Sequence, residues 1–274
     1  MLKFSIITPT YMQSRYVAHC ISSVQSQSYM QYEHLIYDAL SSDDTSAVVG
    51  SFLEDARIVY RRETDAGPAD AINKGLDVAR GDIFCWLNSD DCYFDAEVLQ
   101  RVAQLFERHS EVDVITGCGY FVADDGTLIR PFMMPDPGRI SHEGLRGSDY
   151  FLQPSTFWRR NTLRLEPRLS YCFDWKLFLD FYAHGLSVLY VPEYFSKYRL
   201  QPTSRTMLDC AARKREVVAI LRYAGAGRLQ MAWATFVYLC YRLSELTGIS
   251  AVKKTTRSLN FVVHRLSAGR VYSP

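Results

Sequence analysis

Two adjacent carboxylates that follow a buried strand are the clearest chemical feature of this sequence. The hydrophobic run 83–87 gives way to Asn88, Ser89, Asp90 and Asp91. In open α/β sheets, ligands bind beyond the carboxyl ends of the strands. Two neighbouring Asp side chains repel each other there unless a cation or hydrogen-bond donors compensate. A hard divalent ion shared with a phosphate-bearing substrate would compensate, whereas the simpler interpretation makes the pair a turn before a helix.

Strand and helix patterns alternate around this pair. Residue types predict strands over 3–8, 33–37, 57–62 and 83–87. Helical spacing predicts helices over 14–27, through Val48 and Leu53, from Pro68 to about Gly81, and from a cap at Asp95 to about His109. This order favours an α/β fold with a parallel sheet between helices. The chain has no GxGxxG and no GxxxxGK[ST], so neither a dinucleotide fold nor a P-loop is supported.

The rhythm changes after residue 112. A hairpin is predicted from strands over 112–122 and 127–134, followed by strands over 152–158 and 187–191 with a helix over 173–183 between them. Beyond Arg205 the pattern predicts three helical stretches, broken at Gly225/Gly227 and at Gly248. We therefore expect a domain over 1–204 and a helical extension over 205–274.

Charge divides the chain in the same place. Residues 205–274 carry 12 Lys/Arg and 3 Asp/Glu, a net +9, whereas residues 1–204 carry a net −8. Basic residues beside an apolar helical face predict that the extension lies on an anionic membrane surface. The alternative is a helical cap packed on the catalytic domain, because an amphipathic helix is first of all a packing device.

Cysteine usage and the N-terminus suggest a compartment. The seven Cys are scattered, without a CxxC pair or a His/Cys cluster, so neither structural zinc nor a disulfide framework is indicated. No signal peptide precedes the first strand, and the longest apolar run, 231–241, is too short to span a bilayer. We expect a cytoplasmic protein, held peripherally at the inner face of the plasma membrane where the extension binds lipid.

Ordered motifs over residues 3–205 resemble the family 2 glycosyltransferases of the GT-A fold, of the kind that build bacterial surface polysaccharides. The motifs are SIITPTY from Ser5, SSVQSQSY from Ser22, Asp38 with Ser41 to Thr45, DAG from Asp65, DAINKG from Asp70, WLNSDD from Trp86, QPSTFW from Gln153 and DWKLF from Asp174. The resemblance implies a mostly parallel central sheet flanked by helices. It also implies a nucleotide-sugar donor, with a UDP-sugar as the default.

The resemblance assigns the donor site. It implies that Asp91 binds Mn²⁺ or Mg²⁺ directly, and that Asp90 lies beside the ribose and the waters of the metal. The nucleoside would be lined by Thr8, Pro9, Tyr11, Asp38 and Asp65. Taken alone, Asp38 can equally well cap a turn at the end of its strand. Similar enzymes often carry a second Asp after this one, where the present chain has Ala39.

The resemblance also assigns the acceptor side. Asp174 would be the general base that takes the proton of the acceptor hydroxyl, although Asp is also a common residue in the first turn of a helix. The segment from Gln153 to Trp158 would floor the acceptor site, with Trp158 stacked on a sugar or simply part of the core. Gln201 stands where similar proteins often have a diphosphate-contacting His, and Arg199 could supply positive charge there.

The sequence thus predicts an inverting, metal-dependent glycosyltransferase acting on a hydroxyl of a glycan or lipid-linked acceptor. The alternative is a non-catalytic sugar-nucleotide or glycan binder, consistent with Gln201. A nucleotidyltransferase would need a glycine-rich loop after the first strand, where Tyr11 to Arg15 has no glycine. A nucleic-acid partner is not expected, since the chain contains no recognisable module for one.

Overall fold

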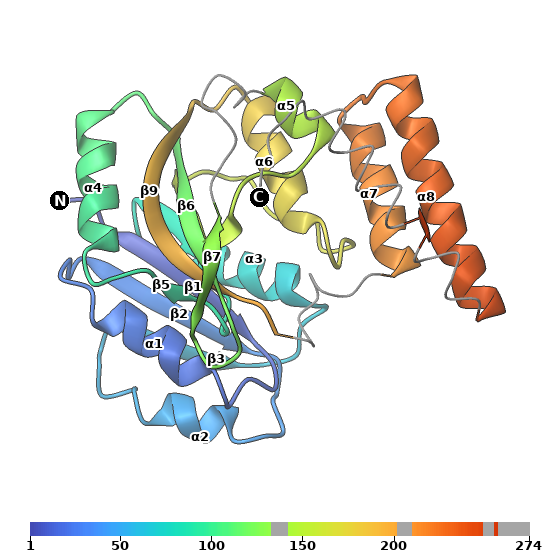
Figure 1. The fold of residues 1–274 in the computed structure, drawn as a ribbon. Helices are drawn as coiled ribbons and strands as arrows, with labels where there is room; N and C mark the ends of the chain where they lie inside the picture. Colours follow the sequence, from blue (N-terminus) through green and yellow to red (C-terminus); the bar gives the residue numbers. More distant parts are fainter. Residues whose placement is uncertain (133–141, 202–209, 249–254, 257–274) are drawn as a thin grey trace.

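A single mixed sheet with helices on both faces forms the centre of the molecule (Figure 1). The structure is a computed structural model and describes residues 1–132, 142–201, 210–248 and 255–256. Within them the strand order is β3-β2-β1-β4-β8-β6-β9-β5, with β7 paired to β6. The strands are β1 (Phe4–Thr10), β2 (Tyr32–Asp38), β3 (Ile58–Arg62), β4 (Ile83–Trp86), β5 (Cys92–Tyr93), β6 (Val114–Val122), β7 (Leu128–Phe132), β8 (Thr156–Arg159) and β9 (Val188–Arg199).

Helices connect these strands and cover the sheet. They are α1 (Val17–Gln25), α2 (Thr45–Gly50), α3 (Pro68–Val78), α4 (Val98–Arg108), α5 (His142–Gly147), α6 (Phe173–Ala183), α7 (Ala211–Tyr223) and α8 (Arg228–Thr247), with a short 3₁₀ turn at Gln153–Ser155. The α/β fold class and the strand–helix alternation of the first half are confirmed.

The first half of the sheet is parallel. β1 pairs in parallel with β2 and β4, and β2 pairs in parallel with β3. All seven residues of β1 are buried because helices cover both of its faces. Side chains alternate along the strand: Ile6 packs with α1 and α4, and Ile7 packs with α3 and α6. This alternation later decides which β1 side chains reach the site.

The second half of the sheet is mixed and departs from the expected boundaries. β8 pairs antiparallel with both β4 and β6, and β9 runs parallel to β6. β9 was expected to end at Val191 before a proline, but it continues through Pro192 to Arg199 with a register shift in its pairing to β6. Register shifts let an edge or irregular strand accommodate proline. The extended β9 carries the chain back to the Asp90–Asp91 segment.

The helix after this segment begins later than expected. α4 starts at Val98, and Asp95 lies in the turn before it. The Asp95 carboxylate accepts a hydrogen bond from the backbone N–H of Glu97 at 2.9 Å and forms an ion pair with Arg101 at 3.0 Å. Asp95 therefore stabilises the entry to the helix rather than capping it directly.

α7 and α8 form a helical pair at one side of the molecule, beside α5 and α6 (Figure 1). The pair turns at residues 224–227, as the glycines predicted, and α8 ends before Gly248, which has φ 71°. Ile220 and Leu221 of α7 join the large core cluster that also contains α3 and α6. The pair therefore packs on the domain. The third predicted helical stretch falls largely outside the described residues.

No helix within the described ranges is long and apolar enough to cross a membrane.

Candidate active site

A cavity of about 1050 Å³ opens beyond the carboxyl ends of β1 and β4. Its walls come from every part of the chain. The side nearest the sheet is lined by Pro9, Tyr11, Asp65, Asp90 and Asp91. The facing side is formed by the start of α6 and by side chains of α7 and α8. Residues far apart in sequence, from Pro9 to Val237, thus share one cavity.

Asp90 and Asp91 lie on the loop between β4 and β5, and both are held by residues at or just after the end of β9. Asp91 is 2% exposed, and its carboxylate accepts hydrogen bonds from the backbone N–H of Arg199 at 2.9 Å and from Asn88 at 3.2 Å. The Asp90 carboxylate accepts a 2.6 Å hydrogen bond from the side-chain amide of Gln201. Gln201 therefore lies beside Asp90 and orients its carboxylate.

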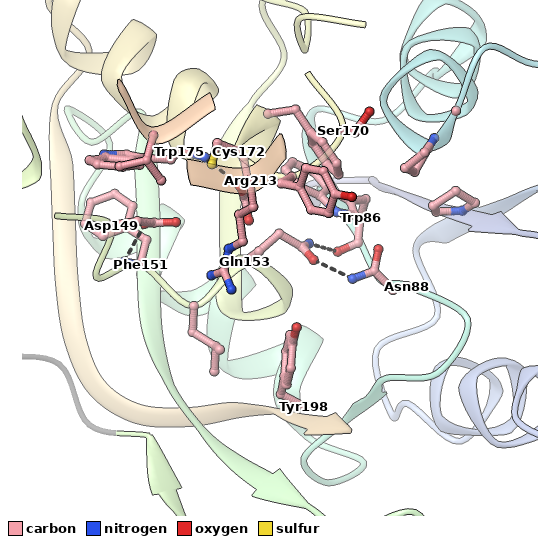
Figure 2. Close-up of a pocket in the computed structure, with 18 of the residues that line it drawn as sticks. Trp86, Asn88, Asp149, Phe151, Gln153, Ser170, Cys172, Trp175, Tyr198 and Arg213 are labelled. Atoms are coloured by element: carbon pink, nitrogen blue, oxygen red, sulfur yellow. Dashed lines mark hydrogen bonds between the residues drawn. The ribbon is translucent and has the colours of Figure 1, made fainter. Parts of the chain in front are cut away.

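Gln153 is hydrogen-bonded to the segment at the end of β4, next to Asn88 (Figure 2). Its amide nitrogen donates to the backbone carbonyl of Trp86 at 2.7 Å, and its carbonyl accepts from Asn88 at 3.0 Å. Asn88 in turn donates to Asp91. A chain of hydrogen bonds thus joins Gln153 to the Asp90–Asp91 loop, and Gln153 lines the cavity.

The electrostatics of the pair favour a bound cation. Burial raises the pKa of both carboxyls, and the charge of Asp90 adds to the rise at Asp91. Two carboxylates so close together repel each other, and a cation would relieve that repulsion. Among the described residues, no group of three or more His, Cys, Asp or Glu side chains could hold a metal ion. Asp90 and Asp91 offer hard oxygen ligands at the cavity, which fit Mg²⁺ or Mn²⁺ held by one or two carboxylates, with substrate phosphates and water completing the shell.

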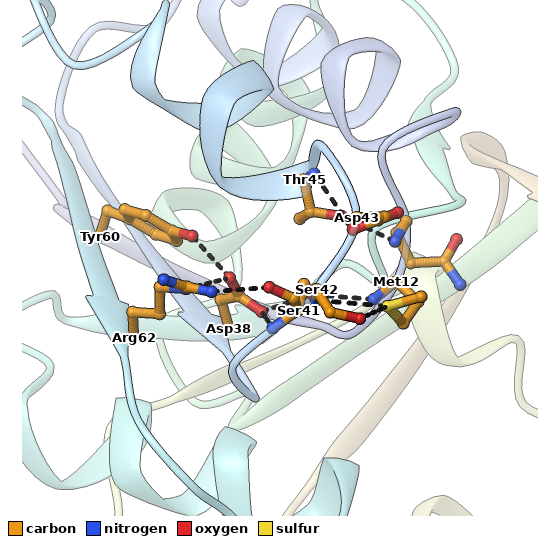
Figure 3. Close-up of polar contacts among 9 residues, drawn as sticks. Met12, Asp38, Ser41, Ser42, Asp43, Thr45, Tyr60 and Arg62 are labelled. Carbon is orange, nitrogen blue, oxygen red and sulfur yellow. Dashed lines mark hydrogen bonds and ion pairs between the residues drawn. The ribbon is translucent and has the colours of Figure 1, made fainter.

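The loop after β2 is ordered by two aspartates (Figure 3). The Asp38 carboxylate accepts hydrogen bonds from the Ser41 hydroxyl at 2.6 Å and from the Tyr60 hydroxyl at 2.6 Å, and Arg62 lies 3.4 Å from it. Asp43 accepts hydrogen bonds from Thr45 and from the backbone N–H of Ser14 at 3.1 Å. Partial burial alone would raise the pKa of Asp43, but these hydrogen bonds outweigh it and lower the pKa to about 2.

This loop meets the end of β1 beside the cavity. The backbone N–H of Met12 donates to the Ser41 hydroxyl at 2.8 Å. Met12 and Leu40 both adopt left-handed backbone conformations, with φ 54° and 57°. Such conformations are unfavourable for residues other than glycine and persist where the surrounding contacts impose them. Their neighbours Tyr11 and Ala39 line the cavity, so the strained backbone shapes the predicted nucleoside end.

Two predicted nucleotide contacts lie away from the cavity. Thr8 is fully buried, and its hydroxyl pairs with His34 at 2.8 Å on the α1 side of the sheet. Strand alternation explains this, because Thr8 points the same way as Ile6, whereas Pro9 lines the cavity. Asp38 is 1% exposed, and its oxygens are engaged by the loop it orders. Pro9, Tyr11, Asp65 and Asp90 do line the cavity.

Asp174 lies in the first turn of α6, which forms part of the cavity wall. One carboxylate oxygen accepts the backbone N–H of Trp175 at 2.8 Å. Burial among the walls raises the pKa of Asp174 to about 6, although the side chain keeps partial contact with the cavity. A carboxyl with this pKa is ionised at neutral pH and basic enough to accept a proton from a hydroxyl during transfer.

Asp149 is a second carboxylate on this wall that the sequence did not reveal. It is exposed to the cavity and accepts a hydrogen bond from the backbone N–H of Phe151 at 3.2 Å. The surrounding walls and the charge of Asp174 raise the pKa of Asp149. Figure 2 shows Arg213 of α7 reaching into the same cavity, where its charge lowers the pKa of both carboxyls.

Two predicted acceptor-side contacts need correction. Trp158 is 1% exposed and packs edge-on against Trp86 at 5.7 Å between ring centroids, beneath α6. It belongs to the core, so it is not available to stack on a sugar. The Arg199 guanidinium donates to the backbone carbonyls of Asp90 at 3.0 Å and Asp124 at 2.6 Å, and it does not line the cavity. Arg199 therefore stabilises the backbone of the Asp90–Asp91 loop.

The aromatic lining comes from residues other than Trp158. Trp86, Trp175, Tyr198 and Trp233 all line the cavity. Trp86 was visible in sequence only as part of the strand before the paired carboxylates. Trp175 follows Asp174, and Tyr198 precedes Gln201 by three positions. This closeness in sequence was the one signal that could have marked them as cavity residues.

Comparison with known proteins decides the family. Residues 5–168 match the family model described as Glycosyl transferase family 2. The chain belongs to this family. The matched segment contains the Asp90–Asp91 loop and Gln153.

Two relatives match different shares of the chain. The PGL/p-HBAD biosynthesis glycosyltransferase of Mycobacterium bovis is 33% identical over 116 residues, which cover 42% of this chain and 45% of that relative. The match therefore spans less than half the length of that protein. TuaG of Bacillus subtilis, named for teichuronic acid biosynthesis, is 26% identical over 241 residues, covering 86% of this chain and 93% of TuaG.

Solved structures confirm the fold of this glycosyltransferase. S. aureus TarS 1–349 in complex with UDP-GlcNAc has a TM-score of 0.65 and 17% identity, covering 89% of this chain and 73% of that chain. Mannosyltransferase PcManGT from Pyrobaculum calidifontis, in complex with GDP-Man and Mn²⁺, has a TM-score of 0.62 and 14% identity, covering 98% of this chain and 81% of that chain. At these identities the likeness concerns the fold alone.

Proposed function

We propose that the chain is an inverting glycosyltransferase that moves a sugar from a nucleoside-diphosphate sugar, with UDP as the default nucleotide, to an acceptor hydroxyl. The observation that carries this proposal is that two separate carboxylate sites line one cavity. Asp90 and Asp91 line the wall at the strand ends, and Asp174 lines the wall at the start of α6. The solved complexes of TarS with UDP-GlcNAc and of PcManGT with GDP-Man support a nucleotide-sugar donor.

Asp91, with Asp90 beside it, would hold Mn²⁺ or Mg²⁺. When bound, that ion neutralises charge on the departing diphosphate. The protein contributes the rest of the donor site. Gln201 orients the Asp90 carboxylate, Asn88 and the Arg199 backbone orient Asp91, and Asp65 lies toward the predicted base end.

Asp174 would take the proton of the acceptor hydroxyl as the acceptor oxygen bonds to the anomeric carbon. The bond between that carbon and the diphosphate oxygen breaks, and the nucleoside diphosphate leaves with the bonding pair. Attack from the side opposite the leaving group inverts the anomeric configuration. Asp174 and Asp91 both line this cavity, which supports assigning the base and the leaving group to these two sites.

The acceptor is proposed to be a lipid-linked saccharide. Val217, Leu221, Ala234 and Val237 of the helical pair give the acceptor side of the cavity an apolar wall. Exposed leucines on α8 add apolar surface on the outside of the molecule. Leu229, Leu239 and Leu246 are 88%, 56% and 70% exposed, at the spacing of one helical face. The biosynthetic names of the two relatives point to glycolipid and surface-polysaccharide acceptors.

Peripheral attachment to an anionic membrane is proposed from the same exposed leucines of α8. α7 and α8 carry six Lys/Arg and two Asp/Glu, so an apolar helical face is accompanied by net positive charge. Vesicle flotation at low salt tests this. Leu239→Ser should weaken binding to anionic vesicles, whereas Leu128→Ser, at a leucine 51% exposed on β7, should leave it unchanged. Equal binding of both variants would refute the attachment.

The transfer reaction itself is tested by following nucleotide-sugar turnover and the anomeric configuration of the product by NMR. The proposal predicts turnover of a UDP-sugar with Mn²⁺, an inverted product, and loss of turnover in Asp91→Asn. Asp82→Asn is the matched control, because Asp82 precedes the amino end of the same strand β4. A retained configuration, or an active Asp91→Asn variant, would contradict the proposal.

A further inference from the structure

Glu216 of α7 connects the helical extension to the turn that carries Asp174. Its carboxylate accepts three backbone hydrogen bonds from consecutive residues: Ser170 at 2.8 Å, Tyr171 at 2.8 Å and Cys172 at 3.0 Å. The side chain is buried, with 7% of its surface exposed. Three successive N–H groups that converge on one anion form a well-defined binding nest for it.

Burial of a carboxylate at this position requires such partners. An ionised Glu without hydrogen bonds is strongly unfavourable in a protein interior, and N–H groups donated to it offset that cost. Because the donors are backbone groups, the contact fixes the path of the main chain rather than one rotamer. The main chain of residues 170–172 is therefore held directly against α7.

This segment leads directly into the predicted base. Cys172 is the N-cap of α6, and Asp174 lies two residues further on, in the first turn. A fixed Cys172 sets where the helix starts and in which direction Asp174 leaves the backbone. Ser170, Cys172 and Asp174 all line the cavity. A small displacement of the segment would thus move the Asp174 carboxylate relative to an acceptor hydroxyl.

We propose that Glu216 is a positioning residue for the transfer reaction, which holds Asp174 in place from the helical extension through the backbone of residues 170–172. The inference rests on the proposed role of Asp174. It assigns a catalytic purpose to part of the chain that lies outside the matched family segment 5–168. It also means that α7 and the first turn of α6 act as one unit.

Two substitutions of Glu216 test this, with one matched control. Glu216→Ala removes all three hydrogen bonds, and Glu216→Gln keeps one acceptor oxygen without the charge. Glu245→Gln is the control, because Glu245 on α8 likewise accepts a backbone N–H, that of Ala211, at 2.8 Å. For each full-length protein we would measure kcat, the KM for donor, UDP binding by calorimetry, thermal unfolding and the pH–rate profile.

Misplacement of a reacting group by about 1 Å costs on the order of 100-fold in rate. We therefore expect Glu216→Ala to lower kcat by one to two orders of magnitude with UDP affinity unchanged. Glu216→Gln should keep an intermediate kcat, and Glu245→Gln should match the wild type. The groups that bear on Asp174 are Asp149, Arg213 and Glu216, so loss of the Glu216 charge should also move the acid limb of Glu216→Gln to lower pH.

A wild-type kcat in folded Glu216→Ala would overturn the inference. So would equal losses of kcat and UDP affinity, which indicate a general structural role. If Glu216→Ala does not fold, Glu216→Gln decides by the same criteria. Failure of the wild type itself to turn over any nucleotide sugar would instead overturn the proposed function, and the inference with it.

Discussion

Replacing Asp174 with asparagine should make the protein more stable and nearly inactive. The carboxyl pKa rises from 3.8 to about 6 because the charge is buried among the cavity walls. At neutral pH the ionised group therefore destabilises the folded state by up to about 3 kcal/mol. Since the side chain keeps partial contact with the cavity, water screens part of this cost, and a gain of about 1–2 kcal/mol is expected for Asp174→Asn.

The sign depends on pH in a definite way. The folded-state pKa of Asp174 lies above its unfolded value, so the stability gain of Asp174→Asn is fully present above about pH 6. It shrinks as the pH falls from 6 toward 4, because the wild-type carboxyl becomes protonated in the folded state. Urea unfolding should therefore show a clearly larger difference at pH 8 than at pH 4.5.

Activity should change in the opposite direction. The wild-type pH–rate profile should lose activity with a midpoint near pH 6, and Asp174→Asn should lower kcat by about 10²–10⁴-fold. Asp180→Asn on the same helix is the control, because Lys176 and Tyr223 hold that carboxylate at 2.7 and 2.6 Å. It should lose about 1–3 kcal/mol of stability instead. A destabilised Asp174→Asn, or an acid limb near pH 4, would refute this reasoning.

Two further predictions concern packing and the donor site. Gly119→Ala should destabilise the protein by about 1–3 kcal/mol in urea unfolding, since the new Cβ would overlap the Leu152 side chain and lie 2.7 Å from the backbone carbonyl oxygen of Ser196. Gly50→Ala, with open space around it in α2, should be neutral or stabilising by up to about 1 kcal/mol, and equal effects of the two would contradict the packing. Gln201→His should strengthen Mn²⁺ binding in a metal titration, because imidazole is a better ligand than an amide beside Asp90. Weaker Mn²⁺ binding in that variant would place residue 201 outside the metal site.

The general fold was predictable because its signals are local. Hydrophobic runs that end at polar residues marked the parallel strands, and the run before Asp90 located the site edge. The β5 strand has two residues and α5 has six, so neither leaves a periodic pattern. The sequence prediction ended β9 before Pro192, because proline interrupts a strand unless the pairing shifts register there, as it does here.

The site was predictable only where a residue's direction was implied by its surroundings. β1 is buried along its whole length, so the sequence gives no polar–apolar alternation to show that Thr8 points away from the cavity. Trp158 raised the same difficulty in a strand buried on both faces. Asp149 lies in an irregular segment without periodicity. An acidic residue on the buried face of α7 was a visible anomaly at Glu216, but the backbone it binds is more than 40 positions away.

The central claim is that Asp91 and a divalent metal together hold the nucleotide. Calorimetric titration of UDP into the protein tests it most directly. The titration is run on the wild type with Mn²⁺ and with EDTA, and on Asp91→Asn and Asp174→Asn with Mn²⁺. We predict that UDP binds in the presence of Mn²⁺, that this binding is lost with EDTA and in Asp91→Asn, and that it is retained in Asp174→Asn. UDP binding of equal affinity with EDTA or in Asp91→Asn would contradict it.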